Sequence, residues 1–125
     1  MTEEIEIGEI KRVENYLNSY RINGKLLRLE RYEREYFVDK DAVDFEALGE
    51  VPLARARMYE VRHLINSLPN SDEKLFLYYH YIKGQSVERC GELLGVSRCT
   101  AFRMKKRAHL MVAQVLREKQ EKESD

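Results

Sequence analysis

A short segment of the chain concentrates positive charge that a nucleic acid could bind. Between Arg98 and Arg107 the sequence carries five cationic side chains and no acidic one. Arginine can donate two hydrogen bonds to the edge of a guanine, and both arginine and lysine pair with phosphates. The same residues could instead form an ordinary solvated helix face. The rest of the sequence must decide between these two interpretations.

The distribution of charge along the chain favours a polyanion as partner. The 125 residues contain 22 basic and 22 acidic side chains, which cancel. Residues 1–50 nevertheless carry a net charge of −5, residues 83–117 a net charge of +6, and the last eight residues a net charge of −2. One part of the chain is therefore basic although the whole is neutral, and such asymmetry is typical of proteins that bind nucleic acid.

The residues around the basic segment follow the pattern of a helix-turn-helix. Ser86 is a good N-cap for a short helix, Gly95 supplies the positive φ of a turn, and Ser97 caps a second helix. Gly91 stands where the two helices must approach closely. Apolar positions at three- and four-residue spacing are expected to face the core. They are Val87, Cys90, Leu94, Val96, Ala101, Met104, Ala108 and Met111.

The side chains left on the outward face of the second helix are the candidate DNA contacts. In such a motif the N-terminal part of the second helix enters the major groove. We expect Arg98 and Arg103 to read base edges, with Cys99 and Phe102 as apolar contacts to bases. The candidate phosphate contacts are Ser97, Lys105, Lys106 and Arg107.

Composition and spacing predict an all-α fold, with an N-terminal helical arm followed by a helix-turn-helix bundle. Glycine and proline are scarce, at 6 and 2 residues, and no alternation typical of strands is sustained. We divide the chain into an arm with an acidic linker (1–51), a DNA-binding domain (52–118) and a disordered tail (119–125).

The arm contains two amphipathic stretches. The first runs to Tyr20, Asn23-Gly24 interrupts the pattern, and the second runs from Lys25 to Phe37. The two stretches form either one kinked helix or a hairpin of two helices. The arm then packs on the DNA-binding domain, forms a homodimer, or docks on RNA polymerase.

The segment from Leu75 to Leu116, LFLYYHYIKGQSVERCGELLGVSRCTAFRMKKRAHLMVAQVL, resembles the fourth conserved region of sigma factors. The matching positions are Leu77, Tyr81, Ile82, Gly84, Ser86, Leu94, Val96, Ser97, Thr100, Arg103, Lys105, Arg107 and Ala108. The usual isoleucine-alanine pair of that region is Cys90-Gly91 in this chain. The resemblance implies a sigma region 4-like helix-turn-helix, and it implies a set of base-reading positions. These are Arg98, Cys99, Thr100, Phe102 and Arg103.

The small size and the N-terminal helical arm extend the resemblance to the ArpU/RinA-type regulators of Gram-positive phages. Those regulators activate late genes for packaging and lysis. The resemblance therefore implies an activator of phage or mobile-element genes. Two other functions remain open on the residues alone: a small terminase subunit-like DNA-packaging protein, and a protein-interaction module whose basic helix docks on an acidic partner.

No pattern in the sequence points to catalysis, a metal or a cofactor. Cys90 and Cys99 form no Cys-x-x-Cys pair, and the three histidines are dispersed. No apolar run approaches the roughly 18 residues of a membrane-spanning helix. The start, MTEEIEIGEI, lacks the layout of a signal peptide. We therefore expect a cytoplasmic DNA-binding protein that is not an enzyme.

Overall fold

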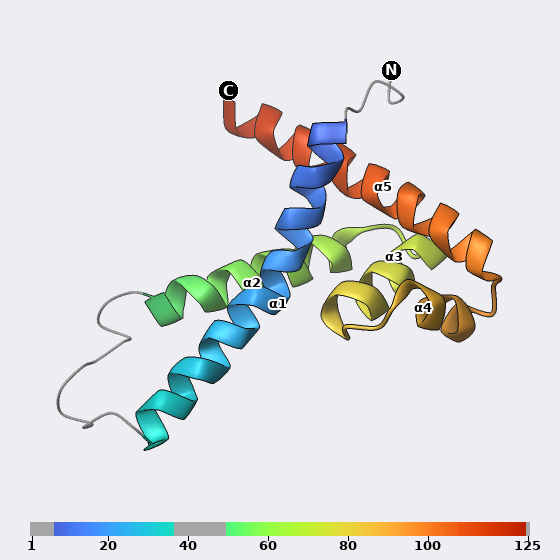
Figure 1. Ribbon diagram of the computed structural model, residues 1–125. Coiled ribbons are helices and arrows are strands. Elements are labelled where there is room, and N and C mark those ends of the chain that lie inside the picture. Colours follow the sequence, from blue (N-terminus) through green and yellow to red (C-terminus); the bar gives the residue numbers. More distant parts are fainter. Residues whose placement is uncertain (1–6, 37–49, 125) are drawn as a thin grey trace.

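The computed structural model describes residues 7–36 and 50–124, and all regular structure in these two ranges is helical (Figure 1). The elements are α1 (Ile7–Tyr36), α2 (Glu50–Ser67), α3 (Asp72–Leu77), the π-helical segment η2 (Tyr78–Ile82), α4 (Val87–Leu94) and α5 (Arg98–Ser124). The prediction of an all-α fold is confirmed for these residues. Most of the predicted acidic linker lies outside them. No described helix combines the length and the apolar character that crossing a bilayer requires.

The N-terminal arm is one helix, so the predicted interruption at Asn23-Gly24 is wrong. The side-chain amide of Asn23 donates to the carbonyl oxygen of Ser19 at 2.8 Å and is thus satisfied within α1. Gly24 is buried because α2 passes close to it: a Cβ at this position would lie 3.4 Å from Cε of Met58. Gly24 therefore permits the contact between α1 and α2 and does not end a helix.

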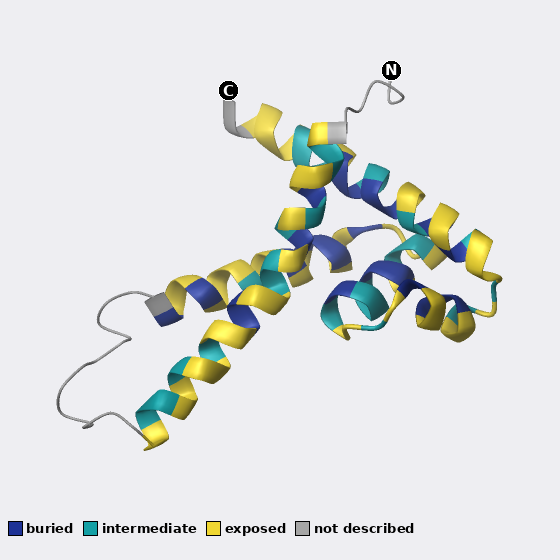
Figure 2. Cartoon of the chain, viewed as in Figure 1, coloured by how far each residue is buried: buried dark blue, intermediate teal, exposed yellow. Residues whose placement is uncertain are grey.

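The N-terminal half of α1 belongs to the same core as the helices that follow. Val13 and Leu17 are buried in one cluster with residues of α2, α3, η2, α4 and α5 (Figure 2). The other buried members are Val61, Leu64, Ile65, Leu68, Phe76, Leu77, Tyr81, Val87, Cys90, Ala101, Met104, Ala108, Val112 and Ala113. The C-terminal half of α1 and the start of α2 project away from α3, α4 and the start of α5 (Figure 1).

The helix that precedes α4 changes its hydrogen-bond pattern part-way. Ser71 caps α3, because its Oγ accepts from the backbone N–H of Lys74 in the first turn. Beyond α3, the backbone N–H of Lys83 donates to the carbonyl oxygen of Tyr78, five residues earlier, at 3.0 Å. This wider π-helical segment ends at Ile82, and Gly84 follows two residues later with a φ of 74°. The α-helical turns of α3 thus continue directly into the π-helical segment η2.

The last helix is longer than the sequence predicts. A disordered tail is expected from residue 119, but α5 continues to Ser124. Gln114 donates to Glu118 within the helix at 3.2 Å. Arg117 makes two hydrogen bonds of 2.6 Å to the carboxylate of Glu9 on α1. These bonds lower the pKa of Glu9 and fasten the far part of α5 to the start of α1.

Candidate nucleic-acid interface

α4 and α5 are joined by a tight turn with capped ends. Oγ of Ser86 accepts from the backbone N–H of Arg89 at 3.1 Å and begins α4. Gly95 ends α4 in the left-handed region, at φ 72° and ψ 31°, which favours glycine. The next N–H, of Val96, donates to the carbonyl oxygen of Gly91 at 2.8 Å. The roles predicted for Ser86 and Gly95 are confirmed.

Gly91 is the point where α4 comes closest to α5. A Cβ at this position would lie 3.1 Å from Cβ of Ala101 and 3.3 Å from the carbonyl oxygen of Val96. Both neighbours are held in place, since Ala101 is fully buried and the carbonyl is backbone. The predicted role of Gly91 in the crossing of two helices is therefore confirmed. A larger residue at this position would have to displace Ala101 or the backbone at Val96.

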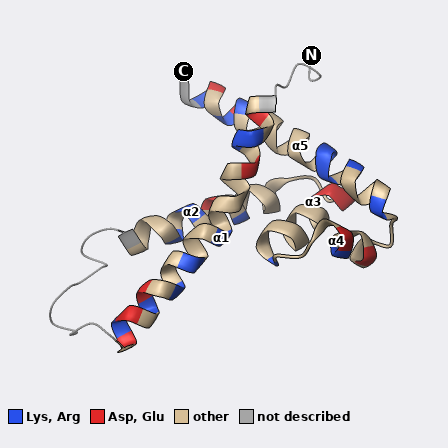
Figure 3. Ribbon diagram, viewed as in Figure 1, with Lys and Arg blue, Asp and Glu red and all other residues tan. Residues whose placement is uncertain are grey.

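α5 buries one side and exposes the opposite side. Ala101, Met104 and Ala108 are at most 2% exposed, as predicted, whereas Met111 and Leu94 are only partly buried. Seven of the predicted DNA contacts are exposed: Ser97, Arg98, Cys99, Phe102, Arg103, Lys106 and Arg107. Thr100 and Lys105 are half-buried at the edges of this surface. In Figure 3 the ribbon of α5 is blue, the colour of Lys and Arg, at several positions along its first part.

In the first half of α5, three cations have no acidic partner within the described part of the chain. They are Arg103, Lys105 and Lys106. Burial lowers the pKa of His80 and of His109, and the nearby charge of Lys105 acts on both in the same direction. Because these three charges are not neutralised by described neighbours, they produce a positive field that attracts anions.

Arg98 is positioned by a neighbour on each side. Its Nε lies 3.4 Å from a carboxylate oxygen of Glu88 on α4, and its guanidinium lies 5.7 Å from the centre of the Phe102 ring. Both partners of the ion pair are largely exposed, and exposed pairs contribute about 0–1 kcal/mol. A nucleic acid could therefore replace Glu88 as the partner of Arg98 at little cost. Phe102 is 41% exposed and free to touch a base.

Arg107 has a partner that the sequence pattern did not reveal. Its Nε donates to Oε1 of Glu73 on α3 at 2.9 Å. This hydrogen bond lowers the pKa of the Glu73 carboxyl. Arg107 thus ties α5 to α3, and a phosphate would have to compete with the Glu73 carboxylate for it.

The hydroxyl groups at the start of α5 form a local network. Oγ of Ser97 accepts from the backbone N–H of Thr100 at 3.2 Å and donates to Oγ1 of Thr100 at 3.0 Å. The single hydroxyl hydrogen of Ser97 is therefore used within the cap. A phosphate at this position would meet backbone N–H groups of the first turn instead of that hydroxyl. Thr100 keeps its own hydroxyl hydrogen for an outside partner.

A second group of cations was missed by the sequence reasoning. One cleft of about 290 Å³ is lined by Arg21 and Arg28 of α1 and by Lys83, the residue that follows η2. None of the three forms an ion pair with an acidic residue among those the structure describes. A Cβ on Gly84 would lie 3.2 Å from Cζ of Arg21, so the glycine lets this guanidinium approach the backbone. The cleft has the charge to hold an anion.

The cysteines that the structure describes are free, and none of its described residues forms a metal site. The described residues contain no group of three or more His, Cys, Asp and Glu side chains that could bind a metal ion. Cys90 is buried, and burial raises the pKa of its thiol. Cys99 is exposed on α5 and is not bonded to Cys90.

Comparison with known proteins finds a family model that matches more than half of the chain. Residues 35–113 match DUF1492, a family described as a protein of unknown function. The chain belongs to the DUF1492 family. The DUF1492 match covers α2, α3, η2, α4 and the part of α5 that carries the predicted DNA contacts. No curated protein and no solved structure matches the chain.

Proposed function

We propose that this DUF1492 protein is a sequence-specific, double-stranded DNA-binding transcriptional regulator, and that α4 and α5 form a sigma region 4-like helix-turn-helix. The observation that carries the proposal is the positive charge of Arg103 and Lys106, which lies opposite the buried stripe of α5 and lacks a described acidic partner. The capped turn and the close crossing at Gly91 support it, because they present this surface on a rigid helix pair.

In the proposed complex the N-terminal part of α5 lies in the major groove. Arg103 donates two hydrogen bonds to a guanine, and Phe102 and Cys99 contact apolar base edges such as a thymine methyl. Arg98 leaves the carboxylate of Glu88 and pairs with the nucleic acid instead. Thr100 donates its hydroxyl hydrogen to the nucleic acid. Sequence is thus read by a few side chains of one helix.

The remaining charges fix the protein on the duplex. Lys106 and Lys105 pair with phosphates, and the backbone N–H groups after Ser97 receive another at the start of α5. Arg107 joins these contacts only when it leaves Glu73. Because phosphate contacts release counterions, binding should weaken steeply as salt rises.

The biological role follows from the resemblance to the ArpU/RinA-type regulators. On that basis we propose an activator of phage or mobile-element late genes that acts in the cytoplasm, with RNA polymerase as a further partner. The proposal involves no enzymatic step, metal or cofactor.

The deciding experiment is a selection of bound sequences from random duplex DNA at about 0.15 M salt, where weak surface charges are screened. The wild-type chain should recover a defined motif, and Arg103→Ala should recover a motif that is relaxed at one position. Lys122→Ala, which removes an exposed cation far along α5, is the matched control and should recover the wild-type motif. Recovery of no motif, with binding that disappears as salt rises, would overturn the regulator and favour a packaging protein or a protein-interaction module.

A further inference from the structure

The cleft between α1 and the end of η2 is lined by three cations and, among the described residues, by no carboxylate. Arg21, Arg28 and Lys83 carry the charges. The other residues that line the cleft are Tyr20, Gly24, Met58, Ile82 and Gly84. Three like charges around a cleft of about 290 Å³ repel one another and produce a positive field inside it. An anion that enters this cationic cleft removes the repulsion.

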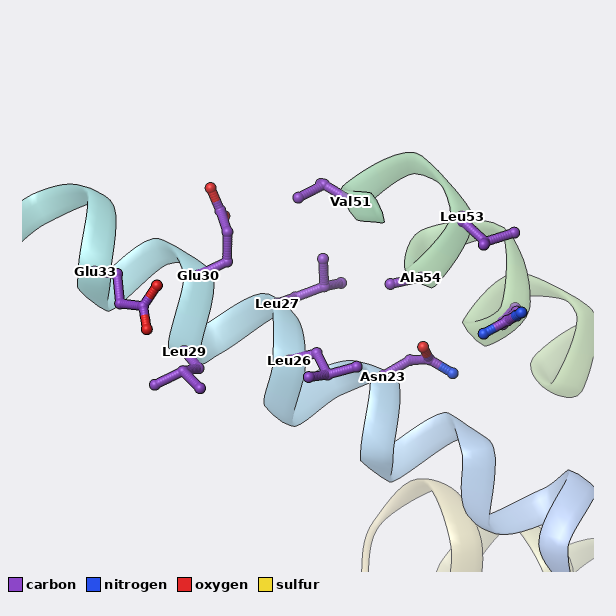
Figure 4. Close-up of a pocket in the computed structure, with 10 residues that line it drawn as sticks. Asn23, Leu26, Leu27, Leu29, Glu30, Glu33, Val51, Leu53 and Ala54 are labelled. Atoms are coloured by element: carbon purple, nitrogen blue, oxygen red, sulfur yellow. The ribbon is translucent and has the colours of Figure 1, made fainter. Parts of the chain in front are cut away.

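Two other clefts of the described structure carry carboxylates of their own. Figure 4 shows Glu30 and Glu33 among the residues that line a cleft of about 390 Å³ between α1 and the start of α2. A cleft between the start of α1 and the far part of α5 contains Glu9, whose carboxylate makes two hydrogen bonds to Arg117. The cationic cleft differs from both, because no described acidic side chain neutralises its charge.

Two glycines let the guanidinium groups of the cationic cleft lie close to the backbone. A Cβ on Gly84 would lie 3.2 Å from Cζ of Arg21. A Cβ on Gly24 would lie 3.8 Å from Nη1 of Arg28. Each guanidinium group therefore lies against a backbone segment that lines the cleft, and no Cβ atom stands between them.

Tyr20 adds a hydrogen-bond donor to the cationic cleft. Its hydroxyl oxygen accepts from Nη2 of Arg62 on α2 at 2.8 Å. The hydroxyl hydrogen of Tyr20 has no acceptor among the described residues, so it is available to a ligand. Hydrogen bonds in a chain polarise one another, and the bond from Arg62 therefore makes the Tyr20 hydroxyl a better donor to an anion.

The groups that line the cationic cleft match a terminal phosphate better than other common anions. A guanidinium group is planar and donates two parallel hydrogen bonds to a phosphate or a carboxylate. A carboxylate carries one negative charge, and so does each phosphate within a nucleic-acid strand. A terminal phosphate carries nearly two charges at neutral pH and offers three acceptor oxygens. Three cations and one hydroxyl donor therefore suit a terminal phosphate or a diphosphate.

We infer that the cationic cleft binds the terminal phosphate or diphosphate of a small molecule. Its volume of about 290 Å³ lies at the lower end of the roughly 300–1,000 Å³ of small-molecule sites, so the ligand is small. Tyr20, Met58 and Ile82 supply apolar surface for the organic part of the ligand. Lys83 and Gly84 stand shortly before α4, so a bound ligand connects α1 to the start of the proposed helix-turn-helix.

Titration calorimetry with inorganic pyrophosphate tests the site without DNA, so the result is independent of the proposed function. At about 0.05 M salt, where charges are only partly screened, the wild type should bind one pyrophosphate per chain and saturate. The double variant Arg21→Ala, Lys83→Ala should bind pyrophosphate at least tenfold more weakly. The matched control Arg103→Ala, Lys106→Ala removes the same charge from exposed positions of α5 and should bind like the wild type. No saturable binding to the wild type, or equal losses in the two variants, would indicate an adventitious ion only and overturn the inference.

A variant of unchanged net charge tests the guanidinium geometry. Arg21→Lys replaces a planar group that donates two parallel hydrogen bonds by a single ammonium group. It should bind pyrophosphate severalfold more weakly than the wild type. An unchanged affinity would show that the cleft attracts anions by charge alone, and would contradict a site built for phosphate.

Duplex DNA distinguishes a small-molecule phosphate from a phosphate of the nucleic acid. The variant Arg21→Ala, Lys83→Ala should bind DNA with the wild-type slope of log affinity against log salt concentration. The control Arg103→Ala, Lys106→Ala should reduce that slope, because it loses a proposed phosphate contact. A reduced slope for the cleft variant would place a DNA phosphate in the cationic cleft and overturn the small-molecule ligand. If the chain binds no DNA, the proposed function fails while the pyrophosphate result still stands.

Discussion

The hydroxyl of Tyr81 and Nε2 of His109 share a hydrogen bond of 2.5 Å inside the core, where the imidazole is only 2% exposed. The bond joins η2 to the middle of α5. Burial lowers the pKa of His109 to about 4, and burial also raises the pKa of Tyr81. Both groups are therefore neutral at physiological pH. The pair fills a polar position in the core without burying a charge.

This burial makes stability depend on pH. An unfolded histidine titrates near 6.5, so the unfolded chain takes up a proton at His109 before the folded chain does. The stability that the neutral, buried His109 contributes is fully present above pH 6.5. As the pH falls toward 4 this stability should be lost, which lowers the free energy of unfolding by up to about 3 kcal/mol. Burial also lowers the pKa of His80, which acts in the same direction. Urea unfolding at pH 7 and pH 5 measures the loss.

The variant that isolates this effect is His109→Leu combined with Tyr81→Phe, which removes both polar groups together. Its free energy of unfolding should change less between pH 7 and pH 5 than that of the wild type. An equal change in both proteins would show that His109 is not the titrating group.

Gly91→Ala should destabilise the fold, because the new Cβ would lie 3.1 Å from Cβ of Ala101. We expect a loss of about 1–3 kcal/mol, typical of overpacking in a core. Gly8→Ala is the matched control, since nothing lies within 4 Å of its Cβ position and alanine favours a helix. Denaturant unfolding of both variants checks the prediction, and equal effects would count against the close crossing.

Arg103→Ala and Lys106→Ala should differ in their effect on DNA. Loss of a base-reading arginine should cost about 1–3 kcal/mol on the selected motif and little on random DNA. Loss of a phosphate-binding lysine should weaken both about equally and reduce the salt dependence by about one charge. Fluorescence anisotropy over a salt series separates the two. Similar losses on both DNAs for Arg103→Ala would contradict its role in base reading.

Glu73→Gln should strengthen binding to random DNA, because it removes the charged partner that holds Arg107. If Arg107 then pairs with a phosphate, the slope of log affinity against log salt concentration should steepen by the amount expected for about one more phosphate contact. The same anisotropy series provides the measurement. An unchanged slope would mean that Arg107 serves only to join α5 to α3.

The cleft between Arg21 and Lys83 permits a similar test. If the cleft binds the phosphate backbone of the duplex, the double variant Arg21→Ala, Lys83→Ala should bind DNA with a weaker salt dependence. The slope of log affinity against log salt concentration should fall by the amount expected for about two lost charges. The double variant Lys119→Ala, Lys122→Ala, near the end of α5, is the matched control. Equal slopes for the two variants would show that the cleft does not face the DNA.

Local signals in the sequence sufficed for the turn between α4 and α5. Ser86, Gly91 and Gly95 act through neighbours at most ten residues away or through their own backbone, and the structure has each of them in the predicted role. Asn23-Gly24 carries the same kind of local signal but lies inside α1. There a tertiary contact with Met58 decides the outcome, because a buried glycine at a helix crossing has the same sequence signature as one at a helix end.

The sequence by itself determined the all-α class, the caps of α4 and α5, and the row of basic residues that α5 presents. Only the tertiary structure decided which of those charges have partners. Arg107 is bound by Glu73, 34 residues away in the sequence, while Arg103 and Lys106 have no described acidic partner. It also decided which apolar residues of α1 enter the core, such as Val13 and Leu17, and which stay exposed, such as Ile22 and Leu29. Periodicity specifies that a helix has an apolar face, but packing against distant residues specifies which face is buried.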